Sequence, residues 1–402
     1  MRSFLPITGL TALALALSAC GANTGGIPSA GGQSSVAPAQ RGGAYAYSAN
    51  VVRACPAVYG PNIAQCQALV RTDVGGGPDI SGLVPSDLQS AYNLPSAKAG
   101  KGEVVAVVDA FDDPNAESDL AVYRKQFGLP ACNKKNPCFE KVNEQGQQSN
   151  YPQGSSSWGV EESLDVDMVS AICPNCKIIL VEGTTNNFVD LGTSVNTAVN
   201  ILHADVVSNS YIGYNDKSLG GSAFYRHPGH VIVAAAGDEG YKVGEPAGFD
   251  DVVAVGGTAL STSSGSRGWS ETAWAGTGSG CVLRHHKPAW QHDKGCKFRT
   301  MNDVSAVASP ATGVAIYDTF DRGGWSVIGG TSAASPIIGA VYALAGNASS
   351  QHGGESLYAK GASLFDVTSG TNGSCKHKEL CTGGPGYDGP TGNGTPNGVT
   401  AF

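Results

Sequence analysis

The pattern of hydrophobic residues predicts a sheet of buried strands separated by helices. Residues 103–109 form an apolar run between a glutamate and an aspartate, as expected of a parallel strand covered on both faces. Further strands are predicted at 177–181, 205–208, 231–236 and 252–255, and helices at 115–127, 160–172 and 188–202. Strands that alternate with helices indicate βαβ units. We therefore expect an α/β fold with a doubly wound, mostly parallel sheet and helices on both faces.

Less regular segments flank this predicted core. Residues 20–82 are expected to form a flexible tether, rich in Gly, Ser, Ala, Gln and Pro up to about residue 50, followed by a small appendage clipped by one cysteine pair. The compact domain should then occupy 83–402. Within it, the Gly/Ser-rich stretch 262–300 has no clear periodicity, so we interpret it as surface loops.

Residues 1–19 have the features of a secretory signal peptide, because a charged start is followed by an apolar run too short to span a bilayer. The signal ends in Leu-Ser-Ala-Cys at 17–20, which resembles the lipobox of bacterial lipoproteins and would make Cys20 the acylated first residue. Gly21 in place of Asp then fits sorting to an outer membrane. The alternative is an ordinary signal peptide with a chance cysteine. We expect an exported protein, held at the outer membrane or cell surface by a lipid anchor alone, or periplasmic, or released.

Composition narrows the classes of partner. Of the 402 residues only 14% are charged and the net charge is −8, which argues against nucleic acid as a partner. Eleven cysteines leave ten once Cys20 is set aside, an even number as a set of disulfides requires. Their connectivity stays open, and pairing between near neighbours is the simplest solution: Cys55/Cys66, Cys132/Cys138, Cys173/Cys176, Cys281/Cys296 and Cys375/Cys381.

The pair at 173 and 176 has a second interpretation. A Cys-Pro-Asn-Cys sequence is also compatible with a redox dithiol or with half of a zinc site. No second Cys-x-x-Cys accompanies it in the sequence and no redox fold is indicated around it, so we favour a structural bridge.

A candidate nucleophile lies at Ser332. The sequence Gly-Gly-Thr-Ser at 329–332 follows a strand-like run that ends at Ile328 and precedes an apolar helix at 337–345. The glycines permit a sharp turn, which places Ser332 at or near a helix N-terminus. There the unpaired N–H groups and the helix dipole favour developing negative charge, provided that a base lies nearby. The alternative is that Thr331 or Ser332 only caps the helix.

Three carboxyl groups could serve such a serine. Glu161 and Asp165 are four residues apart on a predicted helix, so both emerge on one face, where two close carboxyls cannot both ionise easily. This pair could act as a general base with an orienting partner, or it could be a solvated helix start. Asp238 follows a buried strand, at the sheet edge where doubly wound folds place their sites. It could also cap its own turn.

Taken together, these three stretches resemble the sedolisin family of serine-carboxyl peptidases. The match covers roughly residues 84–402: Gly-Thr-Ser-x-x-x-Pro at 330–336, Glu-x-x-x-Asp at 161–165 and Ala-Gly-Asp at 236–238, in the family's order. The resemblance implies a subtilisin-like fold. It also implies that Ser332 is the nucleophile, Glu161 the base, Asp165 its partner and Asp238 the oxyanion stabiliser. A true subtilisin would place its catalytic aspartate at Asp109, but no histidine here is followed by Gly-Thr.

The resemblance extends to calcium loops near the C-terminus. It implies one structural Ca²⁺ bound by Asp366 and Asp388 together with backbone carbonyls of Val367, Gly384 and Gly386. Calcium prefers six or more oxygen ligands, which carboxylates and carbonyls can supply. Without the resemblance the same stretch would be interpreted as a glycine-rich coil.

The sequence therefore predicts a membrane-tethered serine-type endopeptidase that hydrolyses polypeptides at an acidic pH optimum and acts as a monomer. The alternative is a non-catalytic cell-surface lipoprotein on a peptidase scaffold. Two features depart from the family. Glu162 and Asp167 are rival carboxylates, and the stretch between Cys20 and Leu83 is too short for the family's large folded propeptide.

Overall fold

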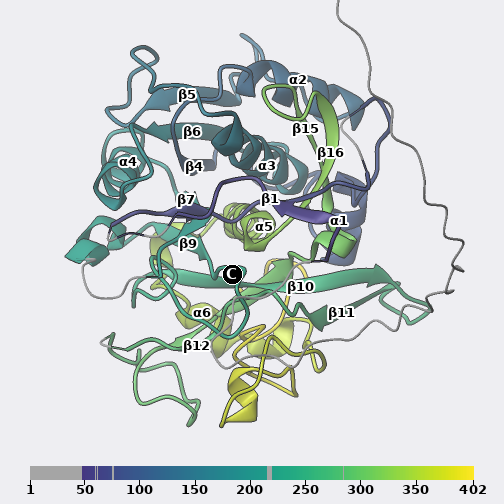
Figure 1. The fold of residues 1–402 in the computed structure, drawn as a ribbon, viewed down its shortest axis with the longest axis vertical. Helices are drawn as coiled ribbons and strands as arrows, with labels where there is room; N and C mark the ends of the chain where they lie inside the picture. The colour runs from purple at the N-terminus through teal and green to yellow at the C-terminus, as the bar shows by residue number, and fades with distance from the viewer. Residues whose placement is uncertain (1–47, 59, 61, 75–76, 215–219, 284) are drawn as a thin grey trace, which may run out of the picture. The chain divides into compact units, whose positions relative to one another are not determined.

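The computed structural model describes residues 48–402 except 59, 61, 75–76, 215–219 and 284 (Figure 1). The predicted signal peptide, Cys20 and most of the predicted tether lie outside the described residues. Among the described residues, no helix combines the length and the apolar character needed to cross a membrane.

A mostly parallel sheet forms the centre of the fold, as the sequence predicted. Its strands lie in the order β11-β10-β9-β7-β4-β6-β5, and β14 also pairs with β10. Every pairing is parallel except that between β10 and β11. The strands are β4 (Val104–Ala110), β5 (Phe139–Asn143), β6 (Lys177–Gly183), β7 (Val206–Asn209), β9 (Val231–Ala235), β10 (Val253–Thr262), β11 (Trp269–Ala273) and β14 (Val304–Val307).

Helices cover both faces of this sheet (Figure 1). Strand β4 shows the alternation: Val105 and Val107 pack into one hydrophobic core, and Ala106, Val108 and Ala110 into the other. The first core contains α3 (Ser156–Ile172) and α5 (Thr331–Ala345), and the second contains α4 (Phe188–Asn200). Because successive side chains of a strand point to opposite faces, Asp109 lies on the face covered by α3 and α5.

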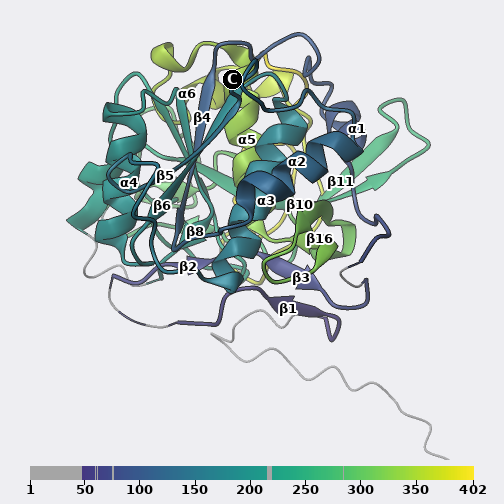
Figure 2. The same ribbon diagram turned by 90° about the horizontal axis from the view of Figure 1, so that it is seen from above.

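A second, antiparallel sheet corrects one prediction. It has the order β1-β3-β16-β15, formed by β1 (Val51–Arg53), β3 (Leu69–Arg71), β16 (Gly324–Gly329) and β15 (Val314–Asp318). The strand that leads to Ser332 is β16, so it lies outside the parallel sheet. Residues 51–82 are no appendage, since β3 pairs with β16 and Leu69 and Val70 are buried in the first core (Figure 2). Strands of three residues are too short for a periodic signal, so the sequence placed the domain start too late, at 83.

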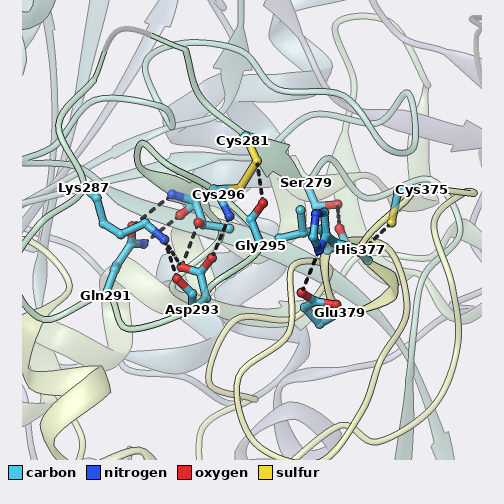
Figure 3. The surroundings of a disulfide bond; sticks show 12 residues. Ser279, Cys281, Lys287, Gln291, Asp293, Gly295, Cys296, Cys375, His377 and Glu379 are labelled. Carbon is cyan, nitrogen blue, oxygen red and sulfur yellow. Dashed lines mark hydrogen bonds and ion pairs between the residues drawn. A yellow bond between two sulfur atoms is a disulfide. The ribbon is translucent and has the colours of Figure 1, made fainter.

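The stretch 262–300 is also more ordered than surface loops. It contains β11 and β12 (Gly280–Cys281), and β12 pairs with β13 (Thr300–Met301). Figure 3 shows Lys287 and Asp293 beside the Cys281–Cys296 disulfide, with an ion pair of 2.6 Å between the Lys287 Nζ and an Asp293 carboxylate oxygen. These contacts join residues that carry no hydrophobic periodicity, which is why the sequence pattern missed them.

The predicted pairing of near-neighbour cysteines is confirmed. Five disulfides are present: Cys55–Cys66, Cys132–Cys138, Cys173–Cys176, Cys281–Cys296 and Cys375–Cys381. The remaining elements are α1 (Pro85–Ala91), α2 (Ala116–Gln126), α6 (Glu355–Ala359), β2 (Gln65–Cys66), β8 (Tyr211–Ile212) and five short 3₁₀ helices at 220–225, 310–312, 348–350, 361–363 and 378–380.

Candidate active site

Ser332 lies at the start of α5, where the sequence placed it. Strand β16 ends at Gly329, Gly330 turns the chain with a φ of +102°, and Ser332 is the second residue of the helix. Pro336 lies one turn later and has no N–H, so the carbonyl oxygen of Ser332 lacks its usual helical partner. The hydroxyl of Ser210 lies 3.3 Å from that carbonyl oxygen and can supply the missing donor.

The Ser332 side chain is fully buried and faces two groups. Its hydroxyl donates a hydrogen bond to the carbonyl oxygen of Ser210 at 3.1 Å. The same hydroxyl lies close enough to the carboxyl of Glu161 to lower the pKa of that group, by stabilising its charged form. The structure therefore brings Ser332 and Glu161 together, although they are 171 positions apart in the chain.

Glu161 and Asp165 are not a solvated helix start. Both have no solvent exposure, because α3 packs against α5 on one side and the sheet on the other. Burial raises the pKa of each well above its usual range, and the charge of Asp109 raises both further. Glu161 Oε2 accepts a hydrogen bond of 2.7 Å from the backbone N–H of Ala68, which favours its charged form.

Ser210 connects Asp165 to the nucleophile. Its hydroxyl lies 2.7 Å from Asp165 Oδ1 and 3.3 Å from the Ser332 carbonyl oxygen. One hydroxyl carries only one proton. If Asp165 is protonated, as its raised pKa favours, Asp165 can donate to Ser210 while Ser210 donates to Ser332. Ser210 follows β7 at the carboxyl edge of the sheet, the same signal that identified Asp238, but the sequence analysis did not single it out.

Asp109 is the second residue that sequence reasoning missed as part of this site. It was considered only as the position of a subtilisin aspartate. The structure buries it completely beside Glu161 and Asp165, and burial raises its pKa to about 8. Neither of its carboxyl oxygens has a hydrogen-bond partner among the described residues, whereas Glu161 has the N–H of Ala68. The hydrogen bond from the N–H of Ala68 therefore favours the charged form of Glu161, whereas burial favours the neutral form of Asp109.

Asp238 lies on the other side of the turn that carries Ser332. It follows β9 and Gly237, and it does not cap its own turn: its Oδ1 accepts hydrogen bonds from the N–H of Thr331 at 2.8 Å and from the Thr331 hydroxyl at 2.7 Å. Burial raises the pKa of Asp238 to about 7 in spite of these bonds and of the nearby positive charge of Arg53. At acidic pH it is therefore protonated and able to donate a hydrogen bond.

The rival carboxylates face elsewhere. Glu162 is buried towards Glu182 and Asp113, whose charges raise its pKa after burial itself. Asp167 Oδ2 accepts a hydrogen bond of 2.9 Å from the N–H of Tyr317 in β15. Of these three carboxylates on α3, Glu161 is the one that lies beside the Ser332 hydroxyl.

The predicted calcium residues come together near the C-terminus. Asp388 is buried, and the charge of Asp366 raises its pKa after burial, so the two carboxyls are close. Asp388 accepts hydrogen bonds from the N–H groups of Gly384 and Thr391, and Asp366 accepts one from Gly386. No cluster of three or more His, Cys, Asp or Glu side chains suited to a metal occurs in the part of the chain that the structure describes. Carboxylate oxygens are ligands that Ca²⁺ prefers, but those of Asp388 and Asp366 accept backbone N–H groups here, and the calcium site stays a prediction.

Comparison with known proteins identifies the family of the chain. The subtilase family model matches residues 145–360. Kumamolisin from Bacillus sp. (strain MN-32) is 30% identical over 354 residues, covering 78% of this chain and 62% of the relative. Sedolisin from Pseudomonas sp. (strain 101) is 26% identical over 357 residues, covering 78% and 58%. Bovine (Bos taurus) tripeptidyl-peptidase 1 is 26% identical over 369 residues, covering 79% and 63%. The chain thus spans between 58% and 63% of the length of these relatives.

Solved structures agree on the fold. Pseudomonas sedolisin, a serine-carboxyl proteinase solved with two molecules of pseudo-iodotyrostatin, superimposes with a TM-score of 0.68 at 24% identity, covering 80% of this chain and 96% of that one. The S41 psychrophilic protease gives a TM-score of 0.52 at 19% identity, covering 79% and 99%. From the match over more than half of its length and from its relatives, we conclude that the chain belongs to the subtilase family and, within it, to the sedolisins.

Proposed function

We propose that the protein is an exported serine-carboxyl endopeptidase with Ser332 as its nucleophile. The observation that carries the proposal is the convergence of a helix-start serine with a carboxyl beside it and a second carboxyl across the turn. Glu161 is close enough to Ser332 for the hydroxyl to lower its pKa, and Asp238 binds the residue before Ser332. A base (Glu161) beside a nucleophile (Ser332), with a neutral acid (Asp238) across the turn, is an arrangement suited to acyl transfer.

In the proposed reaction, Ser332 Oγ attacks the carbonyl carbon of a peptide bond and its proton passes to Glu161. Protonated Asp238 donates a hydrogen bond to the oxyanion that forms, an effect that is strong in a site closed to water. Glu161 then gives the proton to the leaving amine. Asp165, through Ser210, holds the start of α5 in place. Water hydrolyses the acyl-enzyme to complete the cycle.

Calcium and export complete the proposal. Asp366 and Asp388, with carbonyls of Val367, Gly384 and Gly386, would hold one Ca²⁺, whose positive charge would stabilise the C-terminal loops. The five disulfides suit an oxidising compartment outside the cytoplasm. A lipid on Cys20 would anchor the chain at the membrane, and polypeptides would be the substrates of a monomeric enzyme.

The test is hydrolysis of casein between pH 3 and pH 7 by wild type and Ser332→Ala. We expect Ser332→Ala to lose about 10⁶-fold in turnover, as when the nucleophile of another serine peptidase is removed. The variant should fold normally, because a hydroxyl near a helix start contributes only about 1 kcal/mol. Equal activity of the two folded proteins would refute the mechanism. Absence of activity from both at every pH would favour the non-catalytic lipoprotein.

A further inference from the structure

The two edges of the parallel sheet carry opposite charges. The carboxyl ends of β4, β5 and β6 lie on the side of Ser332. Acids gather at that edge: Asp109, Asp112, Asp113, Glu144 and Glu182. Lys141 forms ion pairs with two of them. The segments that lead into the amino ends of the same strands carry five exposed lysines, which we call the lysine surface: Lys98 and Lys101 before β4, Lys125 in the last turn of α2, and Lys134 and Lys135 before β5.

The amino ends of these three strands lie side by side. Strands β4, β6 and β5 are neighbours in the sheet (Figure 1), and their parallel register pairs Val104 with Lys177 and Phe139 with Ile178. Neighbouring strands are about 4.8 Å apart, so the starts of β4 and β5 lie about 10 Å from each other. The segments that precede the two strands therefore meet at one edge of the sheet.

The turn at 173–176 positions the segment before β4. This turn is closed by a disulfide and lies directly before β6. Within it, Asn175 Nδ2 donates hydrogen bonds to the carbonyl oxygens of Ser96 at 3.2 Å and Ala99 at 3.1 Å. The first two residues of the lysine surface are therefore held beside the start of β6.

The same turn holds the end of α2. Arg124, next to the lysine of α2, is buried and donates a hydrogen bond to the carbonyl oxygen of Pro174 at 2.7 Å. It also donates to the carbonyl oxygen of Pro130 at 2.6 Å, which fixes the start of the loop that carries the last two lysines. Lysines from separate parts of the sequence are thus held around a single turn.

A second disulfide loop presents residues 134–135 at a rigid tip. The loop is closed by Cys132 and Cys138. Inside it, Asn133 and Asn136 exchange backbone hydrogen bonds of 2.8 and 2.9 Å, and Asn133 Oδ1 accepts the N–H of the second lysine at 2.9 Å. Because the backbone of the loop is already ordered, contact of its tip with a partner costs little conformational entropy.

The lysine surface carries an excess of positive charge. None of its five lysines forms an ion pair with another residue that the structure describes. Of the acids beside the same strand ends, Glu140 is paired with Lys177. Asp205 accepts the N–H of Val104, and burial followed by the charge of Asp205 raises the pKa of Glu103. Five unpaired cations therefore outweigh the charges of Glu103 and Asp205.

We propose that the lysine surface docks on an anionic lipid membrane. Clustered lysines are attracted to such a surface over about 8 Å at physiological salt. The whole chain has a net charge of −8, so its other faces are repelled by the same membrane. Docking at the amino edge turns the carboxyl edge, with Ser332, away from the membrane and towards soluble polypeptides. The inference goes beyond the proposed function and does not depend on it, because docking needs no catalysis.

The experiment measures binding to vesicles at pH 7 by co-sedimentation. The protein is the chain from Gly21 to Phe402, which keeps every described residue and lacks Cys20, so that no lipid anchors it. It carries Ser332→Ala so that it does not digest itself. Vesicles of phosphatidylglycerol and phosphatidylcholine in equal parts should bind it, whereas vesicles of phosphatidylcholine alone should not. Raising the ionic strength to about 1 M, where the Debye length is about 3 Å, should release it.

Two double variants test whether this surface is responsible. Lys134→Gln with Lys135→Gln should weaken binding to the mixed vesicles about 30-fold, because each lysine near an anionic membrane strengthens binding about fivefold. Lys376→Gln with Lys378→Gln is the matched control, since it removes two exposed lysines from a disulfide loop of the same length. This control should bind like the parent protein.

The control loop lies at the other edge of the sheet. The segment that leads into it is fixed by a hydrogen bond of 2.9 Å from the N–H of Tyr241 to the carbonyl oxygen of Asn372. Tyr241 follows Asp238, beyond the carboxyl end of β9. Its lysines therefore point to no membrane that the amino edge contacts.

The outcomes either support or overturn the inference. Equal binding to both kinds of vesicle, or binding to neither, would overturn it. An equal loss in the two double variants would also overturn it, because total charge would then be responsible. Binding of heparin without binding of the mixed vesicles would assign the surface to a soluble polyanion instead. Peptide hydrolysis by wild type is measured separately, so failure of docking leaves the proposed peptidase standing.

Discussion

Asp238 binds Thr331 through a single carboxyl oxygen, which accepts hydrogen bonds from both the backbone N–H and the side-chain hydroxyl of Thr331. The Thr331 hydroxyl in turn accepts a hydrogen bond of 3.0 Å from the N–H of Gly237. The Asp238 carboxyl is therefore oriented with Oδ1 towards the helix start and Oδ2 beside Gly330. A proton held by Asp238 is best placed on Oδ2, since Oδ1 already accepts two hydrogen bonds.

Asp238 should set the alkaline limb of the pH–rate profile. Its pKa is about 7 while the site is covered, because burial disfavours its charge, and it should fall once the site opens to solvent. Glu161 needs the opposite state, so kcat should be bell-shaped with an acidic optimum. Asp238→Asn carries a neutral donor at every pH and should lose activity at the optimum but retain the remainder to higher pH.

Removal of the donor provides the control for that profile. Asp238→Ala should lower kcat by about 10²–10³ at the optimum, as when another oxyanion donor is lost. The measurement is a full profile of kcat for the three proteins on one peptide. A wild-type optimum at pH 8 or above, or an Ala variant as active as wild type in acid, would exclude Asp238 as the oxyanion donor.

Glu161→Gln and Glu162→Gln form a matched pair. The two residues are adjacent on α3, both are fully buried, and burial raises the pKa of both. The same neutral, isosteric change should cost Glu161 its proton transfer, about 10²–10⁴ in kcat. Glu162→Gln should change little, because Glu162 faces Glu182 and Asp113. Assays of kcat at the wild-type optimum would show whether the base has been assigned to the wrong neighbour.

Stability should fall as pH rises from acid to neutral. The pKa of Asp238 is about 7 in the folded protein and about 3.9 in an unfolded chain, so the folded state holds the proton more tightly. Its contribution is fully present below about pH 4 and is lost as pH rises through about 7, roughly 4 kcal/mol of unfolding free energy. Glu161, Asp165 and Asp109 act in the same direction.

The measurement is the melting temperature of Ser332→Ala at pH 4 to 8, since this variant lacks the proposed nucleophile and should not digest itself during the experiment. Adding Asp238→Asn to this variant should make the melting temperature fall less steeply with rising pH, because an amide does not titrate. A melting temperature that rises steadily over this range would contradict the raised pKa values.

Calcium removal should destabilise the C-terminal loops. An ion that binds only the folded state adds to its stability, so chelation should lower the melting temperature, and added Ca²⁺ should restore it. Asp366→Asn is the matched control: it removes one exposed carboxylate ligand and should make the melting temperature insensitive to chelator. Metal analysis that finds no calcium in protein never exposed to chelator or acid would count against the site.

Long buried strands and helices could be predicted because each carries its own signal. The run at 103–109 became β4, and the pattern at 115–127 became α2, each within a residue or two. Strands β1 and β3 of the second sheet could not be predicted, since they have three residues each and β3 is fixed by pairing with β16, more than 250 positions away. Pairing at such distance leaves no local periodicity.

The sequence by itself determined the chemical types at the site and their order: a helix-start serine, a glutamate and aspartate one helical turn apart, and an aspartate after a buried strand. Only the tertiary structure decided which of these side chains hold a proton and how far each is buried from solvent. Asp109 and Ser210 join the site because parallel strands bring their carboxyl ends to one edge. Gln67 and Ala68 contact Ser210 and Glu161 through backbone hydrogen bonds, which any residue type can make and which therefore leave no mark in the sequence.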